Sequence, residues 1–290
     1  MDPNFQNMNK EAILTFETFG DQPFLKISNL EMMRPFFMSI VSDSDHWMFI
    51  SSNGGLSAGR KNAENALFPY YTDDKITEFA DITGSKTIFQ LHGSEQIIWE
   101  PFSNRNLSSL KRKSNIYKSI YGNIIVFEEI LLDYHLTFRY SWASSDQFGF
   151  VKTSTIFNNG TQIQDITLLD GIQNIMPCGV PSDLQNNASN LVDAYKRSEL
   201  DAKSGLGLFA LSAIISDKAE PSEALKANVV WSTGLVADAY LLSSKQLDNF
   251  RYGRSIEFET DIKGEKGAYF ISKKLHLKPA ETQDWRIIAD

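Results

Sequence analysis

Strict alternation of large apolar and polar side chains is the feature that most constrains the fold of this chain. The segment His135–Trp142 alternates in this way over its whole length, which is the two-residue period of a strand with one buried face. Ser255–Ile262 repeats the alternation with three acidic residues on its polar side, and Trp285–Ala289 begins another such segment. Three separated strands of this kind predict a broad antiparallel sheet.

Turn and helix signals favour an all-β class with one or two short helices. Asn158–Gly160 interrupts two β-branched runs, and because Asn-Gly tolerates positive φ we predict a hairpin there. One main helix is expected over Asp183–Leu200, where Ser182 and Gln185 have capping-box spacing. A second short helix is expected over Pro221–Ala227. These helices do not alternate with strands, so a parallel α/β sheet is not expected.

The composition fits a folded protein and argues against several classes of function. Of 290 residues, 42% are hydrophobic and 12% aromatic, more core material than a disordered chain carries. The net charge, 28 − 36 = −8, repels phosphate backbones, so we expect no nucleic-acid partner. The single cysteine, Cys178, suits a reducing compartment. Since we find neither a signal peptide nor a run of about 18 apolar residues, we expect a soluble, cytoplasmic protein with no membrane partner.

The densest group of unusual residues lies between Asp43 and Tyr71. Glycines in the Asn53–Asn62 segment allow a ligand to approach the backbone closely, and its amide and basic side chains can donate hydrogen bonds to sugar hydroxyls or phosphate. Aromatic rings on both sides of the segment can stack on a sugar. The predicted binding residues are Trp47, Asn53, Gly54, Gly55, Arg60, Lys61 and Tyr70.

Within this group, we expect Arg60 and Lys61 to lie on an exposed edge near Trp47 and Tyr70, with donors that a sugar or a partner domain would fill. The alternative is that Asn53–Gly55 is a hairpin turn and that the basic pair belongs to a solvated loop.

The sequence gives little support for a metal site, a nucleotide-binding loop or a catalytic site. Asp43, Asp45 and His46 lack the further partners that a metal ion needs, and the glycine-rich segment lacks the Gly-Lys-Ser/Thr ending of a phosphate-binding loop. We therefore predict no metal, no cofactor and no catalytic residue. Sugar epimerisation would need a histidine and a carboxylate on opposite sides of a ring. Of the histidines His46, His92, His135 and His276, the second and third are the candidates, with Glu257 or Glu259 as base.

The segment Met48–Asn62, followed by Phe68–Tyr71, resembles the early signature of the cellobiose phosphorylase family, the inverting glycoside phosphorylases of the glycoside hydrolase family 94-like group. In that family an early strand ends in a Gly-Gly turn, followed by Ser, basic residues and an aromatic-rich run. Val151–Leu169 is similar to a later strand–turn–strand unit. The resemblance covers most of the chain in layout and the first motif in detail. Ala-Leu-Phe-Pro-Tyr stands where the family has an Arg-x-Thr-Arg-Tyr type ending.

The resemblance implies a galactose-mutarotase-like supersandwich, in which two large antiparallel sheets pack face to face, as a single domain over residues 1–290. In that family the catalytic carboxylate and the phosphate site belong to a following (α/α)6 helical barrel, which is absent here. Because Asp290 directly follows an apolar run, we expect the chain to be the N-terminal part of a longer enzyme. The implied partners are an oligosaccharide or sugar, the downstream barrel and a second copy in a homodimer.

Together these inferences predict a non-catalytic, carbohydrate-binding or structural domain of a glycoside phosphorylase- or glycoside hydrolase-like enzyme. Two alternatives stay open: an aldose 1-epimerase of the mutarotase type, and a purely structural dimerisation domain.

Overall fold

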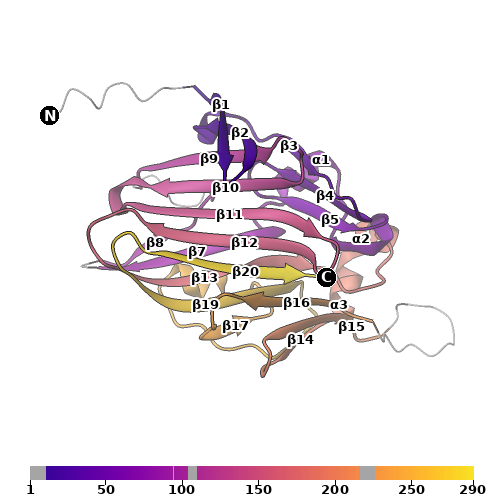
Figure 1. Cartoon of the computed structure of the whole chain (residues 1–290). Helices are drawn as coiled ribbons and strands as arrows, with labels where there is room; N and C mark the ends of the chain where they lie inside the picture. Colours follow the sequence, from indigo (N-terminus) through magenta and orange to yellow (C-terminus); the bar gives the residue numbers. More distant parts are fainter. Residues whose placement is uncertain (1–10, 94, 104–109, 214, 216–225) are drawn as a thin grey trace.

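The structure is a computed structural model that describes residues 11–93, 95–103, 110–213, 215 and 226–290. In this part of the chain, strands form three antiparallel sheets and the helices are short. The predicted all-β class is confirmed. Figure 1 shows the largest sheet spread across the molecule, with strands of a second sheet behind it.

The largest sheet has 11 strands and contains both early and late parts of the described chain. Its final strand along the chain lies in the middle of the sheet, between two strands that are distant in sequence. In spatial order the strands are β1 (Ile13–Phe19), β2 (Gln22–Ser28), β9 (Arg112–Ser119), β10 (Ile124–Leu131), β11 (Leu136–Ser145), β12 (Gly149–Asn158), β20 (Thr282–Ala289), β16 (Asn228–Thr233), β15 (Leu206–Leu211), β14 (Lys196–Asp201) and β18 (Asp261–Lys263).

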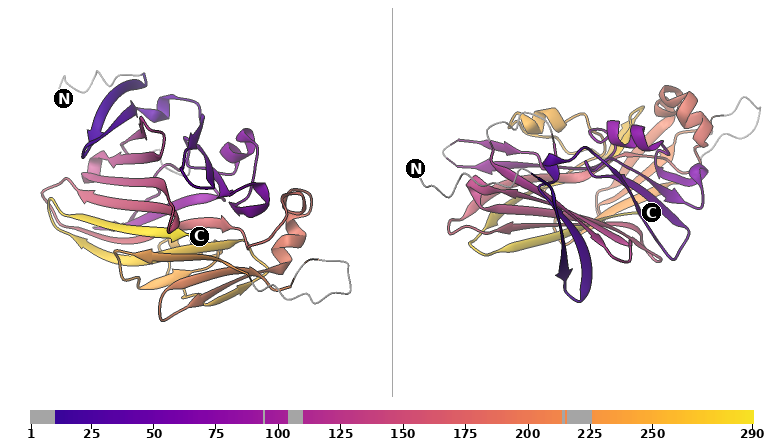
Figure 2. Two further views of the ribbon diagram at one scale, coloured as in Figure 1. Left: turned by 45° about the vertical axis from the view of Figure 1, so that its right-hand side comes forward. Right: turned by 90° about the horizontal axis from the view of Figure 1, so that it is seen from above.

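A five-stranded sheet covers the inner face of the largest sheet, and Figure 2 shows the two layers from the side. The layers share one apolar core, in which the Phe89 ring of the smaller sheet meets the Phe138 ring of β11 at 5.1 Å between centroids. Two large antiparallel sheets packed face to face are the arrangement that the supersandwich prediction requires. In spatial order the five strands are β17 (Ala239–Leu241), β19 (Gly267–Leu277), β13 (Gln164–Ile175), β7 (Gly84–His92) and β8 (Ile97–Trp99).

A third, four-stranded sheet completes the fold. One face of it packs on the main core through Met48, Ile50 and Phe68, and the Phe68 ring contacts Trp142 of β11. The opposite face is partly exposed. In spatial order its strands are β3 (Phe37–Ile40), β4 (His46–Ser51), β5 (Leu56–Arg60) and β6 (Ala66–Phe68).

Four short helices lie among the described residues: α1 (Asp73–Glu78), α2 (Ser182–Asn187), α3 (Ser189–Tyr195) and α4 (Leu247–Arg251). The predicted helix over Asp183–Leu200 is wrong in extent. Non-helical Ala188 (φ −140°) separates α2 from α3, and Lys196 begins β14, which pairs with β15. Sheet pairing therefore overrides the helical pattern after Tyr195. The predicted helix over 221–227 falls mainly outside the described residues.

Two of the three alternating segments form the predicted strands. His135–Trp142 falls largely within β11 and Trp285–Ala289 within β20. The prediction for Ser255–Ile262 is wrong, because most of it is irregular, with Phe258 exposed and Glu259 buried. The Glu259 carboxylate accepts hydrogen bonds from two backbone N–H groups in the loop after β17 (2.7 and 2.9 Å), so this acidic residue stabilises a loop.

The predicted hairpin at Asn158–Gly160 is also wrong. β12 pairs with β11 and β20, whereas β13 pairs with β7 and β19, so this turn carries the chain from one layer to the other. The Asn158 side chain stabilises this connection between the two sheets. Its Nδ2 donates to the carbonyls of Gln162 and Leu277 (2.8 and 3.1 Å), and its Oδ1 accepts from the Gly160 N–H (3.0 Å).

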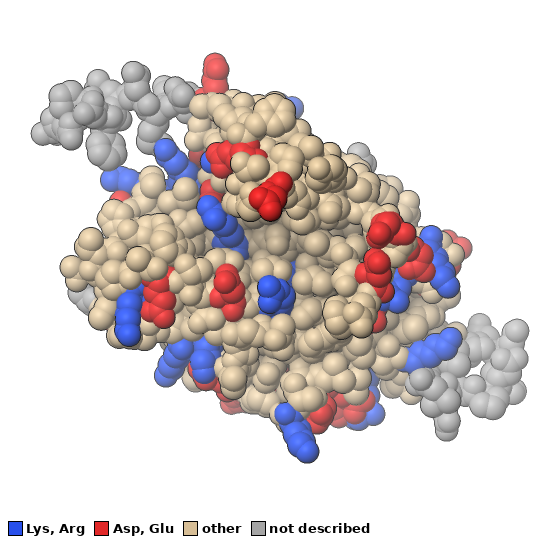
Figure 3. Space-filling model, viewed as in Figure 1, with Lys and Arg blue, Asp and Glu red and all other residues tan. Residues whose placement is uncertain are grey.

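Figure 3 views the outer face of the largest sheet. Basic and acidic side chains are dispersed and intermixed on this face, which therefore lacks the continuous basic surface that binds a phosphate backbone. Among the described residues, none of the helices has the length and apolar character needed to span a bilayer.

Candidate functional site: the β4–β5 hairpin

The predicted binding residues lie on the β4–β5 hairpin and its extensions, but they divide between two places. β4 and β5 pair across the Asn53–Gly55 turn. Because Leu56–Arg60 forms a strand, the turn and the basic pair lie at opposite ends of it. At about 3.3 Å per residue, the two ends are roughly 15 Å apart. The seven residues therefore do not form a single site.

The Asn53–Gly55 segment is a tight turn, as the alternative interpretation held. Gly54 has a φ of 91°, and a Cβ on Gly55 would lie 2.1 Å from the Ile76 carbonyl oxygen. Asn53 fixes the turn, because its Oδ1 accepts from the Gly55 N–H (3.3 Å) and its Nδ2 donates to the Thr77 carbonyl of α1 (2.9 Å). The two glycines are thus required by backbone geometry, whatever else they do.

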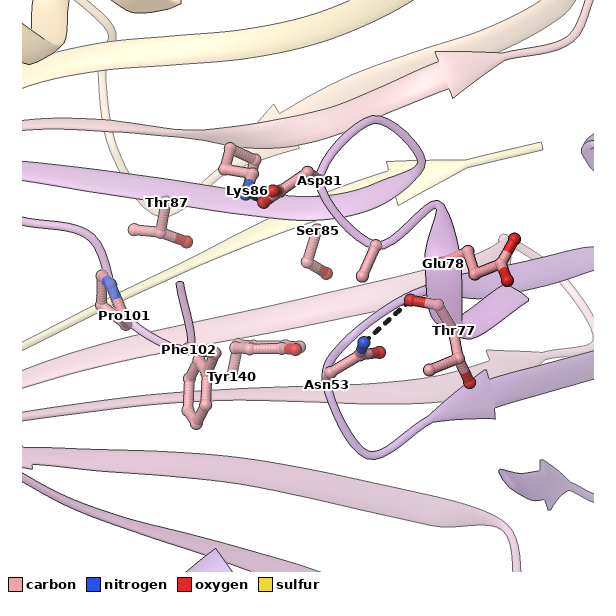
Figure 4. Close-up of a pocket in the computed structure, with 11 residues that line it drawn as sticks. Asn53, Thr77, Glu78, Asp81, Ser85, Lys86, Thr87, Pro101, Phe102 and Tyr140 are labelled. Atoms are coloured by element: carbon pink, nitrogen blue, oxygen red, sulfur yellow. Dashed lines mark hydrogen bonds and ion pairs between the residues drawn. The ribbon is translucent and has the colours of Figure 1, made fainter. Parts of the chain in front are cut away.

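A cavity of about 170 Å³ opens beside this turn. Figure 4 shows its walls, which come from the turn, α1 and the segment after it, the beginning of β7, and β11. The lining is predominantly polar, although Phe102 and Pro101 close one side. Its polar side chains are those of Asn53, Thr77, Glu78, Asp81, Ser85, Lys86, Thr87 and Tyr140.

A buried charge pair lies next to the cavity and joins the two layers of the sandwich. Lys152 Nζ of β12 lies 2.5 Å from Asp170 Oδ1 of β13, and both side chains are fully buried. Asp170 also accepts hydrogen bonds from Thr87 Oγ1 (2.6 Å), Ser154 Oγ (3.1 Å) and Trp285 Nε1 (2.6 Å). Burial lowers the pKa of Lys152, and the Asp170 carboxylate opposes that shift. Thr87 connects this network to the cavity wall.

Four aromatic rings form a strip across the outer face of the four-stranded sheet. Trp47 and Phe49 lie two residues apart on β4, on the same face, with 5.8 Å between their ring centroids. Phe37 stacks on Phe49 (5.4 Å), and Tyr70 meets Trp47 edge-on (5.6 Å). Phe37 and Tyr70 are each 43% exposed. Gly59 lies opposite Trp47, where a Cβ would be 2.7 Å from the indole ring. We call Phe37, Phe49, Trp47 and Tyr70 the aromatic strip.

The basic pair lies at the far end of β5. Arg60 forms an ion pair with Asp290, so the expectation that its donors are left unfilled is wrong. Lys61 is exposed and has a φ of 58°. The residues that follow β5 still border the strip, because Trp47 Nε1 donates a hydrogen bond to the Asn62 carbonyl (3.2 Å).

The residues considered for epimerisation do not converge in the described part of the chain. His92 and His276 lie on the five-stranded sheet, each opposite Asp165 of β13. His135 ends the short 3-10 turn before β11, with a φ of 52°, and Glu259 is bound within its loop. Among the described residues, the hydrogen bonds and ion pairs of His46, His92 and His276 go to Ser44, Thr167 and Asp165, respectively, and none joins a histidine to Glu257 or Glu259. The same residues hold no group of three His, Cys, Asp or Glu side chains that could ligate a metal ion.

Sequence analysis missed half of the strip and the buried network. Trp47 and Phe49 are two residues apart, which places both on one face of a strand, and this spacing was an available signal. Asp170 interrupts the apolar run Leu168–Ile172, where a charge needs a buried partner. The identity of that partner depends on how the two sheets pack and has no local signal.

Comparisons with known proteins leave the family of the chain open. No protein-family model and no curated protein matches it. Three solved structures are similar: a bacterial glucoamylase complexed with acarbose (TM-score 0.43, 7% identity, 89% of this chain and 33% of that chain), a putative kojibiose phosphorylase from human microbiome (0.37, 9%, 91% and 26%) and a galactose mutarotase-like protein from Clostridium acetobutylicum (0.40, 10%, 97% and 99%).

The chain therefore spans about a third of the first of these proteins and about a quarter of the second. All three TM-scores lie below 0.5, so these similarities establish neither the family nor the function of the chain.

Proposed function

We propose that this chain is a non-catalytic carbohydrate-binding domain of a larger glycoside phosphorylase- or hydrolase-like enzyme, and that it binds an oligosaccharide along the aromatic strip. The observation that carries the proposal is the strip itself, in which rings from two strands and a following loop lie in contact on a partly exposed sheet face. Apolar surface left exposed in a folded domain commonly marks a binding surface.

The chemistry of a sugar chain suits this surface. Pyranose rings carry C–H groups on their faces and hydroxyls at their edges, so they can cover aromatic rings while their hydroxyls stay in contact with water or polar side chains. Exposed Tyr70 and half-buried Trp47 offer ring surface, and exposed Asn62, whose carbonyl accepts a hydrogen bond from Trp47 Nε1, is a polar residue beside them. This arrangement favours a neutral ligand held by ring stacking, with polar groups at its rim.

The proposal includes that the chain binds the sugar without catalysing a reaction on it. The strip consists of Phe, Trp and Tyr side chains, and no described hydrogen bond or ion pair places a carboxylate on its rings. A domain of this kind would bind substrate while a downstream barrel performs the chemistry. The membership in the cellobiose phosphorylase family, the single domain over 1–290, the homodimer and the cytoplasmic location belong to this proposal and rest on the sequence resemblance and composition.

The test is calorimetric titration of the chain with cellotetraose and maltotetraose. We expect saturable binding to at least one of them, weakened at least tenfold by Trp47→Ala, because ring-stacking anchors dominate such interfaces. Trp231→Ala is the matched control, since Trp231 is also partly exposed but lies on the outer face of the largest sheet; it should leave affinity unchanged.

Each competing hypothesis has its own readout. Equal losses in the two tryptophan variants, or no binding by the unmodified chain, would contradict the proposal. Mutarotation of α-glucose by the chain would favour the epimerase, and self-association abolished by Trp47→Ala would favour the dimerisation domain.

A further inference from the structure

The cavity beside the Asn53–Gly55 turn is separate from the aromatic strip and has a different chemical character. Its wall is built from side chains of both sandwich layers and of the hairpin, and it borders the buried Lys152–Asp170 pair. The Tyr140 hydroxyl points toward the turn, and a Cβ on Gly54 would lie only 2.9 Å from it (Figure 4). The strip offers ring faces, whereas this cavity offers hydroxyl and amide groups.

The hydrogen-bond network fixes what each wall hydroxyl can offer. Thr87 donates its proton to the Asp170 carboxylate, so its oxygen can only accept a further bond. Ser85 accepts from Trp142 Nε1 (3.0 Å) and contacts the Tyr140 hydroxyl. Burial raises the pKa of Tyr140, which therefore keeps its proton and can donate. An acceptor and a donor thus line the same cavity.

Size and charge narrow the class of ligand. A volume of about 170 Å³ lies below the 300–1,000 Å³ typical of sites for drug-sized molecules, so the cavity suits one small ring. Glu78 and Asp81 at the wall disfavour an anion, and Lys86 is already paired with Asp81 and Glu100. A neutral hydroxyl group, which both donates and accepts, matches the Thr87 and Tyr140 pattern.

We propose that this cavity is a second, independent subsite that holds one neutral sugar residue, with Thr87 and Tyr140 bound to its hydroxyls. The choice of a sugar rests on the proposed carbohydrate function, whereas the location and the neutral, hydroxylic character of the ligand rest on the cavity. The subsite would bind a monosaccharide or one residue of a chain, without using the aromatic strip.

Tryptophan indole signals in a two-dimensional ¹⁵N–¹H NMR spectrum test this directly, because the chain has five tryptophans placed differently. Trp142 and Trp285 donate to Ser85 and Asp170 beside the cavity, and Trp47 lies in the strip. We expect D-glucose or D-galactose at millimolar concentration to shift the Trp142 and Trp285 signals saturably and to leave the Trp47 signal unmoved.

Substitutions test whether the shifts of the tryptophan signals come from a ligand bound in the cavity. Tyr140→Phe removes the donor and should weaken the monosaccharide at least tenfold. Tyr117→Phe is the matched control, because Tyr117 is equally buried but donates to Glu128 on the other side of the largest sheet (2.8 Å); it should change affinity less than twofold. Trp47→Ala should leave the monosaccharide shifts intact.

The outcomes separate this inference from the proposed function. Tetrasaccharide shifts at Trp47 with no monosaccharide shifts at Trp142 or Trp285 would overturn the subsite and leave the strip proposal standing. No shifts with any sugar would overturn both. Shifts with the same midpoint from glycerol would identify an unspecific polyol site and overturn the sugar assignment.

Discussion

The interior of the sandwich and the outer face of the four-stranded sheet depart from the usual placement of side chains in opposite directions. Inside, Lys152 and Asp170 are charged and fully buried; outside, the rings of Phe37 and Tyr70 are exposed. Buried charges destabilise a fold unless they are paired, and the interior pair is satisfied by residues of this chain. Among the described residues, nothing comparable covers the exposed rings, and we therefore expect a ligand to bind on the strip.

Removing the interior carboxylate should give the largest effect. Asp170→Ala would leave Lys152 buried without its counter-charge, and we expect a loss of about 3–5 kcal/mol in the free energy of unfolding, measured by urea denaturation. Asp284→Ala is the control, because Asp284 is exposed and its carboxylate accepts a described hydrogen bond from Thr155 Oγ1 alone (2.6 Å). A double variant, Lys152→Met with Asp170→Leu, should recover much of the loss; equal losses in all three variants would show that charge pairing is not what matters there.

Adding a methyl group beneath the Trp47 ring tests the exterior surface. In Gly59→Ala the new methyl group would lie 2.7 Å from the indole ring and 2.5 Å from the Asn65 carbonyl oxygen, so we expect a loss of about 1–3 kcal/mol from overpacking. Oligosaccharide binding should fall with it. Gly179→Ala is a weaker perturbation by packing, since nothing lies within 4 Å of its Cβ position, although its φ of 81° still adds strain. Unchanged tetrasaccharide affinity in Gly59→Ala would separate Trp47 from binding.

Glu128 and Glu129 are neighbours on β10 and face opposite sides of the sheet. We expect their contributions to stability to depend on pH in opposite directions. Burial would raise the pKa of Glu128, but Arg139 and hydrogen bonds from Asn115 and Tyr117 outweigh it and lower the pKa. Its contribution to stability is therefore present above about pH 4.3, the ordinary pKa of glutamate, and is lost as pH falls through the folded-state pKa. Glu128→Gln should cost about 1.5–3 kcal/mol at pH 7 and less at pH 3.

Glu129 faces the core, and its burial raises the pKa despite contacts with Arg112, Trp99 and Ser114. Its contribution is fully present below about pH 4.3 and is lost as pH rises through the folded-state pKa. The stability difference between the unmodified chain and Glu129→Gln should therefore grow as pH falls, opposite to Glu128→Gln. Denaturation curves at several pH values with parallel trends for the two variants would refute this assignment of faces.

The smallest expected effect is at the end of β5, where Arg60 lies on the face of the sheet opposite to the strip. Arg60→Ala breaks a partly exposed ion pair with Asp290, so the loss of stability should stay below about 1 kcal/mol. Because Arg60 already has a partner, we expect less than a threefold change in oligosaccharide affinity. Arg286→Ala, an exposed arginine of β20, serves as the control in the same melting and titration experiments. A tenfold loss of affinity in Arg60→Ala alone would restore Arg60 as a binding residue.

The sequence predicted those strands whose pairing partners reinforce a local alternation. β11 and β20 each have one face buried against the five-stranded sheet, so their pattern and their environment agree. Ser255–Ile262 shows the same pattern but lacks strand partners over most of its length, and Glu259 is drawn inward by backbone N–H groups that are distant from it in sequence. Alternation alone cannot distinguish these cases, because pairing is decided by non-local contacts.

The candidate site was predictable to a similar extent. Trp47 and Tyr70 could be picked from the sequence as ring-bearing residues, and the strip brings them together. The Lys152–Asp170 pair could not be predicted, because the chain crosses between layers at Asn158 where a hairpin was expected. Only that crossing places β12 and β13 in opposite sheets, with the two charges facing each other.

The most direct test of the central claim is a crystal structure of this chain with cellotetraose or maltotetraose bound. We expect sugar rings to lie along Phe37, Phe49, Trp47 and Tyr70, with at least one ring face on the Trp47 indole. A tetrasaccharide bound elsewhere on the molecule, with the aromatic strip still bare, would contradict it.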